Sequence, residues 1–345
     1  MADALLLLAL KGQSKHLTLC NKNLEKIPQI IGKLDFICQL QLKNNKIKTL
    51  PIEICNLHNL QILNLGNNAL EEFPSLLQHL QSLQKLHLFG NNISLIDGNS
   101  LNGFKKLKLL NMNGNKLKTL PPEICKLESI EHLSIDKNQL NELPVEFCAL
   151  ITLKEFHVAA NCLTSLPLEM GYLINLESLY IQQNKIRELP ESLGKCYRLR
   201  YLDVGANELR IFPTELSSLP LRELYCEENP LLQNLPVFSV QEEEILSLKE
   251  LCARFVMKEL KDRGSSMRRN IRSYPDVRNM LAQSSKCAVC SNAFLNTWLE
   301  CVKFVDAKKD LRLVSMSGLI PVRALLCSYK CFNAAGHSYY GVAFP

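Results

Sequence analysis

The sequence contains no apolar run of the length that a membrane-spanning helix needs, which is about 20 residues. Its first ten residues are mostly apolar, but they include the acidic Asp3 and the run ends at Lys11. A signal peptide begins with basic residues, so we expect instead a short helix that covers the start of the fold. We expect no membrane partner.

Chemistry-bearing patterns are also missing. No phosphate-binding loop, no nucleophile paired with a base and no open metal site can be recognised, and we therefore expect a non-catalytic protein. The chain has 40 basic and 34 acidic residues, of which residues 241–345 contain 16 and 10, so the first 240 residues contain 24 of each. This balance does not favour a nucleic-acid partner.

One pattern recurs through two thirds of the chain. The stretch from Leu63 to Leu70 reads L-x-L-x-x-N-x-L, and its asparagine returns at steps of 22 to 24 residues. The recurring positions are Asn45, Asn68, Asn91, Asn115, Asn138, Asn161, Asn184, Asn207 and Asn229. This is the period of leucine-rich repeats, whose short strands bury their leucines only by stacking. The asparagine amides can donate and accept hydrogen bonds, so we expect them to form a ladder inside the stack.

The predicted fold class is therefore α/β. Residues 1–240 are expected to form a leucine-rich repeat solenoid of about ten repeats, with a helical cap, a parallel concave sheet and short convex helices. Steps such as Leu50-Pro51 end the strands. Residues 241–272 are expected to form an amphipathic helix with a basic linker, and residues 273–345 a small zinc-stapled α+β module.

Fourteen cysteines are scattered along the chain, and no pair brackets the repeats as a capping disulfide would in an extracellular repeat protein. Cys55, Cys125 and Cys148 each lie ten residues after a repeat asparagine, which indicates a packing position. Unpaired cysteines are typical of a reducing compartment. We expect the chain in the cytoplasm, with the nucleus as a further compartment.

The concave face is expected to carry the positions between the strand leucines. Tyrosines with charged neighbours are typical of protein recognition, although exposed positions of any solenoid carry similar residues. The residues predicted to contact a protein substrate are His87, Phe89, His132, His157, Tyr180, Tyr201, Asp203, Tyr225 and Glu227. The histidines lie on different strands without a ligand pattern, so we interpret them as surface residues.

Two close pairs of cysteines follow the repeats, Cys287 with Cys290 and Cys327 with Cys331. Four thiolates suit a tetrahedral zinc ion and leave no position for water, so the predicted cofactor is a structural Zn²⁺ ion. A metal would help a module that has few leucines. Cys301 and His337 are the alternative ligands, and a chance grouping in a cysteine-rich chain is the other interpretation.

Residues 241 to about 263 are predicted to form one amphipathic helix. Three acidic residues, Glu242 to Glu244, lie in its first turn, where the helix dipole favours them. Its apolar stripe consists of Ile245, Leu248, Cys252, Phe255, Val256 and Leu260. The basic run from Lys261 to Arg272 is expected to be a solvated linker.

Within this helix, the segment from Ser247 to Val256 resembles an elongin-binding BC-box. It has a small residue, a leucine, a cysteine four residues on and an apolar residue four further on. The order of repeats, helix and cysteine pairs resembles leucine-rich repeat substrate receptors of cullin-RING ubiquitin ligases. The resemblance implies that Leu248, Cys252 and Val256 bind the elongin B/C adaptor. The cullin box of those receptors has a counterpart from Tyr274 to Arg278, but an arginine occupies the expected apolar position.

The predicted function is a substrate receptor that holds a protein on its concave face near a ligase-bound ubiquitin conjugate. The alternative is an intracellular scaffold or signalling adaptor with no role in ubiquitin transfer. In that case the helix would pack against the last repeat, and we would expect Leu248 and Cys252 to be buried within the chain.

Overall fold

The computed structural model describes residues 2–233, 247–262, 264–295, 299–316, 318–332, 334 and 336–341. The chain divides into two compact units. The repeat unit consists of Met1–Leu209, Ser217–Pro230 and Arg312–Met316. The C-terminal unit consists of Arg210–Leu216, Leu231–Leu311 and Ser317–Pro345.

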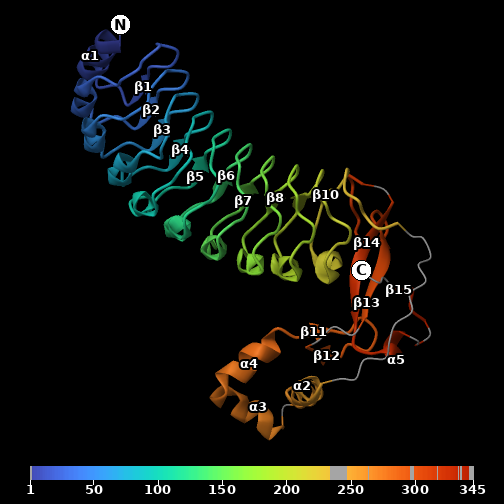
Figure 1. Cartoon of the computed structure of the whole chain (residues 1–345). Helices are drawn as coiled ribbons and strands as arrows, with labels where there is room; N and C mark the ends of the chain where they lie inside the picture. Colours follow the sequence, from blue (N-terminus) through green and yellow to red (C-terminus); the bar gives the residue numbers. More distant parts are fainter. Residues whose placement is uncertain are drawn as a thin grey trace. The chain divides into compact units, whose positions relative to one another are not determined.

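The repeat unit begins with helix α1 (Ala2–Gly12) and continues as a parallel sheet of ten strands in sequence order (Figure 1). The strands are β1 (His16–Thr18), β2 (Gln39–Gln41), β3 (Ile62–Asn64), β4 (Lys85–His87), β5 (Leu109–Asn111), β6 (His132–Ser134), β7 (Glu155–His157), β8 (Ser178–Tyr180), β9 (Tyr201–Asp203) and β10 (Glu223–Tyr225). Each strand has a buried residue between two more exposed ones, as the repeat pattern predicts.

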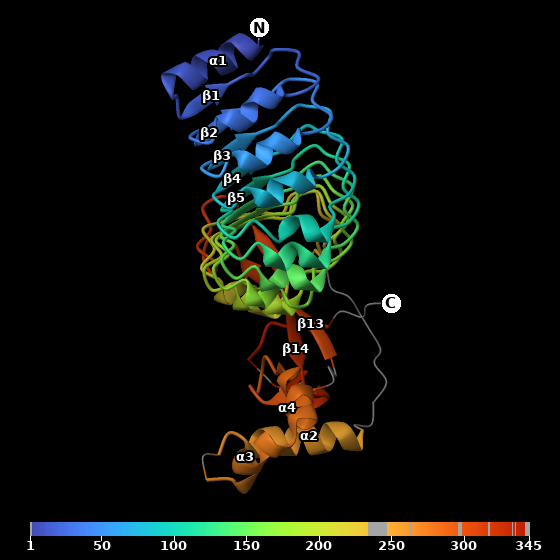
Figure 2. The same ribbon diagram turned by 90° about the vertical axis from the view of Figure 1, so that its left-hand side faces the viewer.

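Short helices cover the other side of the stack, as Figure 2 shows. They are η1 (Gln29–Lys33), η2 (Ile52–Asn56), η3 (Ser75–His79), η4 (Gly98–Leu101), η5 (Pro122–Lys126), η6 (Val145–Ala149), η7 (Met170–Tyr172), η8 (Glu191–Lys195) and η9 (Thr214–Ser218). The expected convex helices are confirmed, and they are 3₁₀ helices of three to five residues. This tight form suits segments of one or two turns.

The asparagine ladder predicted from the sequence is confirmed. Asn138, for example, donates through Nδ2 to the carbonyls of Met112 and Ile135, both at 3.0 Å. Its Oδ1 accepts a hydrogen bond from the backbone N–H of Leu117 at 3.0 Å. One buried amide thus satisfies backbone groups of two neighbouring repeats, which would otherwise be unpaired away from water.

The last strand of the repeat unit is covered by the distant segment Arg312–Met316. The hydroxyl of Ser315 donates to the carbonyl of Leu224 and accepts from its N–H, both at 3.1 Å. Sδ of Met316 lies 3.5 Å from Sγ of Cys226. A side chain from about ninety residues downstream therefore continues the hydrogen bonding of the sheet beyond β10.

The C-terminal unit combines helices with antiparallel strands. It contains α2 (Leu248–Glu259), α3 (Ser266–Asn270), η10 (Ile271–Ser273), α4 (Pro275–Ala282), β11 (Ser285–Lys286), β12 (Ala293–Phe294), β13 (Leu299–Asp306), β14 (Leu319–Leu326), α5 (Tyr329–Phe332) and β15 (Tyr340–Gly341). β11 pairs with β12, and β13 lies between β14 and β15. Phe212 joins this unit, because its N–H donates to Pro321 and its carbonyl accepts from Arg323.

Helix α2 starts at Leu248, where the side chain of Ser247 accepts from the N–H of Glu250. Residues 234–246 lie outside the described part of the chain, and with them the predicted first turn at Glu242–Glu244 and the predicted stripe residue Ile245. Among the helices that the structure describes, none combines the length and the apolar character needed to cross a membrane.

Candidate functional site

The four predicted cysteines lie together in the C-terminal unit. The Sγ atoms of Cys287, Cys290, Cys327 and Cys331 are all within 4.8 Å of one another. Sγ of Cys327 lies 3.5 Å from that of Cys290 and 3.6 Å from that of Cys331. A tetrahedral site with metal–sulfur bonds of about 2.3 Å places its sulfurs about 3.8 Å apart. Four thiols so arranged could bind a metal ion.

Two turns bring these cysteines together. The first is the loop of the β11–β12 hairpin, in which the N–H of Cys287 donates to Asn292 and the N–H of Ser291 to Cys287, both at 2.9 Å. Ser291 has a left-handed backbone, with φ of 60°, so the loop can close tightly. The second turn follows β14 and enters α5, where the N–H of Cys331 donates to the carbonyl of Ser328 at 3.1 Å.

The cysteine cluster differs from an ordinary apolar core in its electrostatics. Burial acts to raise the pKa of Cys287, but hydrogen bonds from the N–H groups of Cys290, Cys327 and Val289 outweigh it and lower the pKa to about 7. Burial raises the pKa of Cys327, and the neighbouring thiols raise it further. The neighbouring sulfurs thus disfavour ionisation of Cys327, whereas a bound cation would favour the thiolate form.

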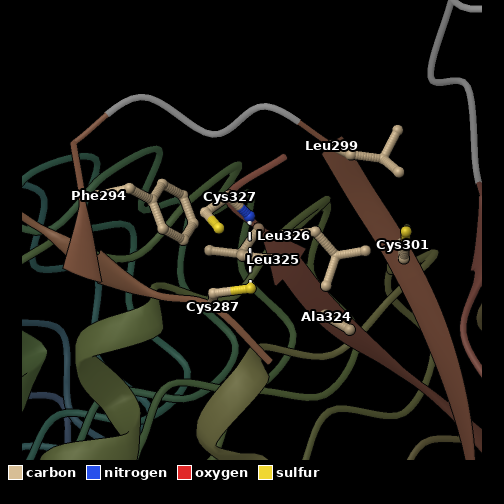
Figure 3. Packing of buried hydrophobic residues seen from close by; sticks show 8 residues of the cluster. All are labelled: Cys287, Phe294, Leu299, Cys301, Ala324, Leu325, Leu326 and Cys327. Atoms are coloured by element: carbon tan, nitrogen blue, oxygen red, sulfur yellow. Dashed lines mark hydrogen bonds between the residues drawn. The ribbon is translucent and has the colours of Figure 1, made fainter. Parts of the chain in front are cut away.

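The two alternative ligands lie apart from this group. Cys301 is buried on β13, and burial raises its pKa to about 12. Figure 3 shows it away from Cys287 and Cys327, which are joined by the hydrogen bond from the N–H of Cys327 to Sγ of Cys287. His337 uses both ring nitrogens: Nε2 bonds the carbonyl of Phe332 at 2.7 Å, and Nδ1 accepts from the N–H of Tyr339 at 3.3 Å.

Helix α2 exposes two of the three predicted adaptor residues. Leu248 is 76% exposed, Cys252 is also exposed, and Val256 is half-buried. Two further apolar side chains, Leu251 and Phe255, are at least half exposed on the same helix. Within the C-terminal unit, Leu248 and Cys252 are therefore not buried, because the helix packs there through a different face; burial against the last repeat stays a prediction of the scaffold interpretation.

The packed face of α2 was not recognised in the sequence. It consists of Glu250, Ala253 and Met257, all of which are buried. Ala253 and Met257 pack with Leu281 of α4, and Val256 borders this small core. The spacing of three and four residues is regular, but one of the three is a glutamate, which hydrophobic periodicity does not detect.

The segment that resembles a cullin box begins α4, with Pro275 at the first helical position. Val277 and Arg278 are both exposed on this helix. The arginine that departs from the expected pattern therefore presents a positive charge on the helix surface.

A connected group of side chains occupies the middle of the concave face. The carboxylate of Glu155 accepts from Nδ1 of His132 at 2.8 Å and from Nε2 of His157 at 2.7 Å. The rings of His157 and Tyr180 stack with centroids 4.3 Å apart. Burial acts to raise the pKa of Glu155, but the hydrogen bonds from His157 and His132 outweigh it and lower the pKa. Sequence reasoning missed Glu155, although its place on β7 could have been found from strand alternation.

Toward the first repeats, the concave face is aromatic and basic. Phe89 lies across Gly66, where a Cβ atom would come within 2.4 Å of its ring. Nζ of Lys43 is 5.2 Å from the centroid of the same ring. Glycine at position 66 therefore gives the ring of Phe89 room to reach Lys43. His87 on β4 makes an edge contact with Phe89, with centroids 6.4 Å apart.

Toward the last repeats, the concave face is aromatic and acidic. Tyr201 and Asp203 lie on β9, and Tyr225 on β10 is exposed beside Glu227. Burial raises the pKa of Asp203, and the charge of Glu227 adds to this increase. The hydroxyl of Tyr225 donates to Glu223 at 2.7 Å. The predicted concave residues thus lie on the strands of one sheet or, for Phe89 and Glu227, two residues after a strand, and the surface is basic toward the first repeats and acidic toward the last.

Family models agree with this architecture. A leucine-rich repeat region model matches residues 10–96, and two further leucine-rich repeat models match residues 81–140 and 175–196. The chain is therefore a leucine-rich repeat protein. Within that class it belongs to the family of leucine-rich repeat-containing protein 69, because it is 63% identical over 343 residues to the Xenopus laevis protein of that name, across 99% of both chains.

More distant matches cover less of the chain. The human leucine-rich repeat-containing protein 69 is 43% identical over 123 residues, which are 36% of this chain and 35% of that one. A solved leucine-rich repeat protein of Leptospira interrogans is 29% identical with a TM-score of 0.60, over 66% of this chain and 64% of the other. The plant peptide hormone receptor RGFR1, solved in complex with RGF2, is 28% identical with a TM-score of 0.51, over 62% of this chain and 40% of the other.

Proposed function

We propose that this chain is a non-catalytic protein-binding protein that acts as the substrate receptor of an elongin–cullin-RING ubiquitin ligase. The observation that carries the proposal is the apolar outer face of α2, on which Leu248 and Cys252 are exposed. Removing apolar surface from water stabilises a complex by about 25 cal/mol per Å². The residues on this face follow the BC-box pattern, so the proposed occupant is the elongin B/C adaptor.

The concave face is the proposed site for the protein substrate. Its last three strands combine Tyr180, Tyr201 and Tyr225 with Asp203 and Glu227. Tyrosine rings bind cations over their faces, and carboxylates form strong hydrogen bonds with lysine and arginine. This composition favours a substrate segment that presents basic side chains. The peptide hormone receptor named above, a member of the same fold class, supports peptide or protein binding as the role of such a sheet.

A structural Zn²⁺ ion at the four cysteines belongs to the proposal. Thiolates are the ligands that zinc prefers, and four of them leave no position for water, so such an ion does not catalyse. When bound, it would link the β11–β12 hairpin to the segment of Cys327 and Cys331. The chain's own contribution is the pair of turns that already bring the sulfurs within 4.8 Å of one another.

The proposed mechanism is proximity. The chain would hold a substrate lysine near a ubiquitin conjugate and so raise its effective concentration without forming a covalent bond. A cullin would complete the ligase, and its contact near α4 would include the charge of Arg278. Because these partners act inside the cell, the proposed location is the cytoplasm or nucleus.

Affinity purification of the full chain tests this function. Leu248→Asp with Cys252→Asp should abolish recovery of elongin, because two charges would enter the apolar contact. Both side chains are exposed, so the variant should fold like the wild type. A Tyr201→Ala and Tyr225→Ala variant should keep elongin and lose the substrate.

The matched control is Lys249→Asp, an exposed change on the same helix at none of the three predicted adaptor positions, which should retain elongin. Equal recovery of elongin with the wild type and the Leu248 and Cys252 variant would contradict the adaptor assignment. If elongin were absent from both while other proteins depended on the concave tyrosines, the scaffold alternative would replace the proposal.

A further inference from the structure

Two charged residues hold helix α2 from behind its exposed apolar face. Glu250 is 1% exposed, and its carboxylate accepts from Nε of Arg254 at 2.5 Å. The same carboxylate accepts from the backbone N–H of Leu295 at 3.1 and 3.2 Å. A buried carboxylate is stable only with such donors. The helix is therefore tied to the residue that directly follows β12.

Arg254 extends this connection to the cysteine cluster. Its Nη2 atom donates to the carbonyl oxygen of Cys327 at 2.8 Å. Its guanidinium carbon lies 5.9 Å from the ring centroid of Phe294, which is fully buried. Because Cys327 lies between Cys290 and Cys331 in the cluster, one side chain joins α2 to a proposed metal ligand.

Apolar packing also holds α2, through a small core bordered by partly buried residues such as Val256, Leu260 and Leu295. Among the described residues of this core, Ala253, Met257 and Leu281 are buried, so the core is small and the polar connection through Arg254 and Glu250 supplements it. The neighbouring core contains Cys287, Phe294 and Cys327 themselves, so its shape depends on where the cysteines are held. Without a bound cation, Sγ of Cys327 has weak sulfur contacts, at 3.5 Å to Cys290 and 3.6 Å to Cys331, in place of a metal–sulfur bond. The carbonyl oxygen of Cys327, which accepts the hydrogen bond from Arg254, would then lose its fixed position.

We propose that metal binding at the four cysteines fixes the position of α2 through Arg254 and Glu250, so that its apolar face is presented to a partner only by the metal-loaded chain. This inference rests on the proposed metal site and concerns the control of the proposed docking helix. Arg254 and Glu250 are positioning residues, since neither belongs to the exposed face nor provides a metal ligand. Loss of the metal to a chelator would leave the docking helix without a fixed position.

Hydrogen exchange of the full chain tests the inference without any partner. The chain is compared when loaded with one equivalent of Zn²⁺ and after treatment with a chelator. The amides of residues 248–260 should exchange at least ten times faster without metal, while those of strands β3 to β8 should keep their rates. Unchanged exchange of α2 in a metal-free chain whose repeats remain protected would overturn the inference.

A variant tests the link between Arg254 and Cys327 while the metal stays bound. Arg254→Gln, loaded with zinc, should show faster exchange in α2 because the bond to Cys327 is lost. Lys249→Gln, an exposed neutralisation on the same helix, should leave exchange unchanged. Weaker zinc binding by Arg254→Gln would also support the coupling, since coupling between two sites is reciprocal. Full zinc binding together with full protection of α2 in this variant would contradict it.

These outcomes distinguish the inference from the proposed function. Failure of the wild-type chain to bind zinc would overturn both the metal assignment and the inference. Failure to recover elongin, with exchange still controlled by zinc, would leave the coupling intact and remove only the adaptor. Zinc binding without any effect on α2 would remove only the coupling.

Discussion

At the scale of single residues, the repeat asparagines are the clearest link between sequence and structure. At the turn after each strand, backbone N–H and C=O groups have no backbone partner. The asparagine amide supplies both a donor and an acceptor for them. Asn138, Asn161 and Asn184 are buried and repeat the same contacts in successive repeats. An apolar residue at these positions would fill the space but leave the backbone groups unpaired.

Asn138→Ala should therefore reduce stability strongly. It removes four hydrogen bonds, to Leu117, Met112, Ile135 and Asp136, and we expect a loss of about 2–4 kcal/mol in the free energy of unfolding. Urea unfolding measures this loss. The neighbouring exposed change Gln139→Ala is the control and should alter the midpoint little. Similar midpoints for the two variants would show that the ladder is dispensable.

At the scale of elements, ion pairs join adjacent repeats beside the sheet. Glu131, which precedes β6, lies 3.0 Å from Nζ of Lys108 and 2.5 Å from Nζ of Lys154. Hydrogen bonds from Lys154 and then from Lys108 lower the pKa of Glu131 to about 2. One carboxylate thus connects β6 with the repeats on both sides of it.

This pKa sets the sign of a pH dependence. Because the folded pKa lies below the usual glutamate value of about 4.3, the contribution of Glu131 is complete above that value and is lost as the pH falls toward 2. Glu131→Gln should lower the urea midpoint at pH 7 by an amount worth at most about 1 kcal/mol, since both lysines are partly exposed. The difference in urea midpoint between this variant and the wild type should vanish near pH 2. Glu128→Gln, which removes a more exposed pair with Lys105, should have a smaller effect. A difference that grew in acid would contradict the assignment.

The repeat strands could be predicted from the sequence, whereas the packing of helix α2 could not. The period of the repeat predicted the strands and the asparagine ladder, and the short spacing within each cysteine pair predicted the four candidate ligands. The packed face of α2 could not be predicted, since burial of Glu250 depends on Leu295, and the partner of Arg254 is the carbonyl of Cys327, 73 residues away. Spacing also pointed to Leu248 and Cys252 as a stripe but could not tell whether the stripe faces the core or solvent.

At the scale of the whole molecule, the repeat unit is a one-dimensional stack, in which each repeat stabilises only its neighbours. Such a stack needs a cap at each end. The structure has α1 before β1 and the segment Arg312–Met316 beside β10. The first cap was expected from the sequence. The second was not, because nothing in residues 312–316 repeats the leucine pattern.

Ser315→Ala tests the second cap. The change removes the donor to the carbonyl of Leu224 and the acceptor for its N–H, and Leu224 is fully buried. We expect amide exchange of β10 to become about tenfold faster, while β2 to β6 keep their rates because coupling passes only between neighbours. Ser75→Ala, a change at an exposed serine of η3, is the control. An equal increase in the amide exchange rates of β10 and β3 would show a global loss of stability instead.

The cap at Ser315 also has a consequence for biosynthesis. Repeats that emerge from the ribosome can stack on those already made, so folding can proceed from α1 as the chain grows. Strand β10 is different, because the residue that closes it is made 91 positions after Leu224. Throughout that interval the newest strand offers an open hydrogen-bonding edge, which is a site for pairing with other nascent chains. The time from synthesis of β10 to synthesis of its cap therefore exposes the nascent chain to misassembly.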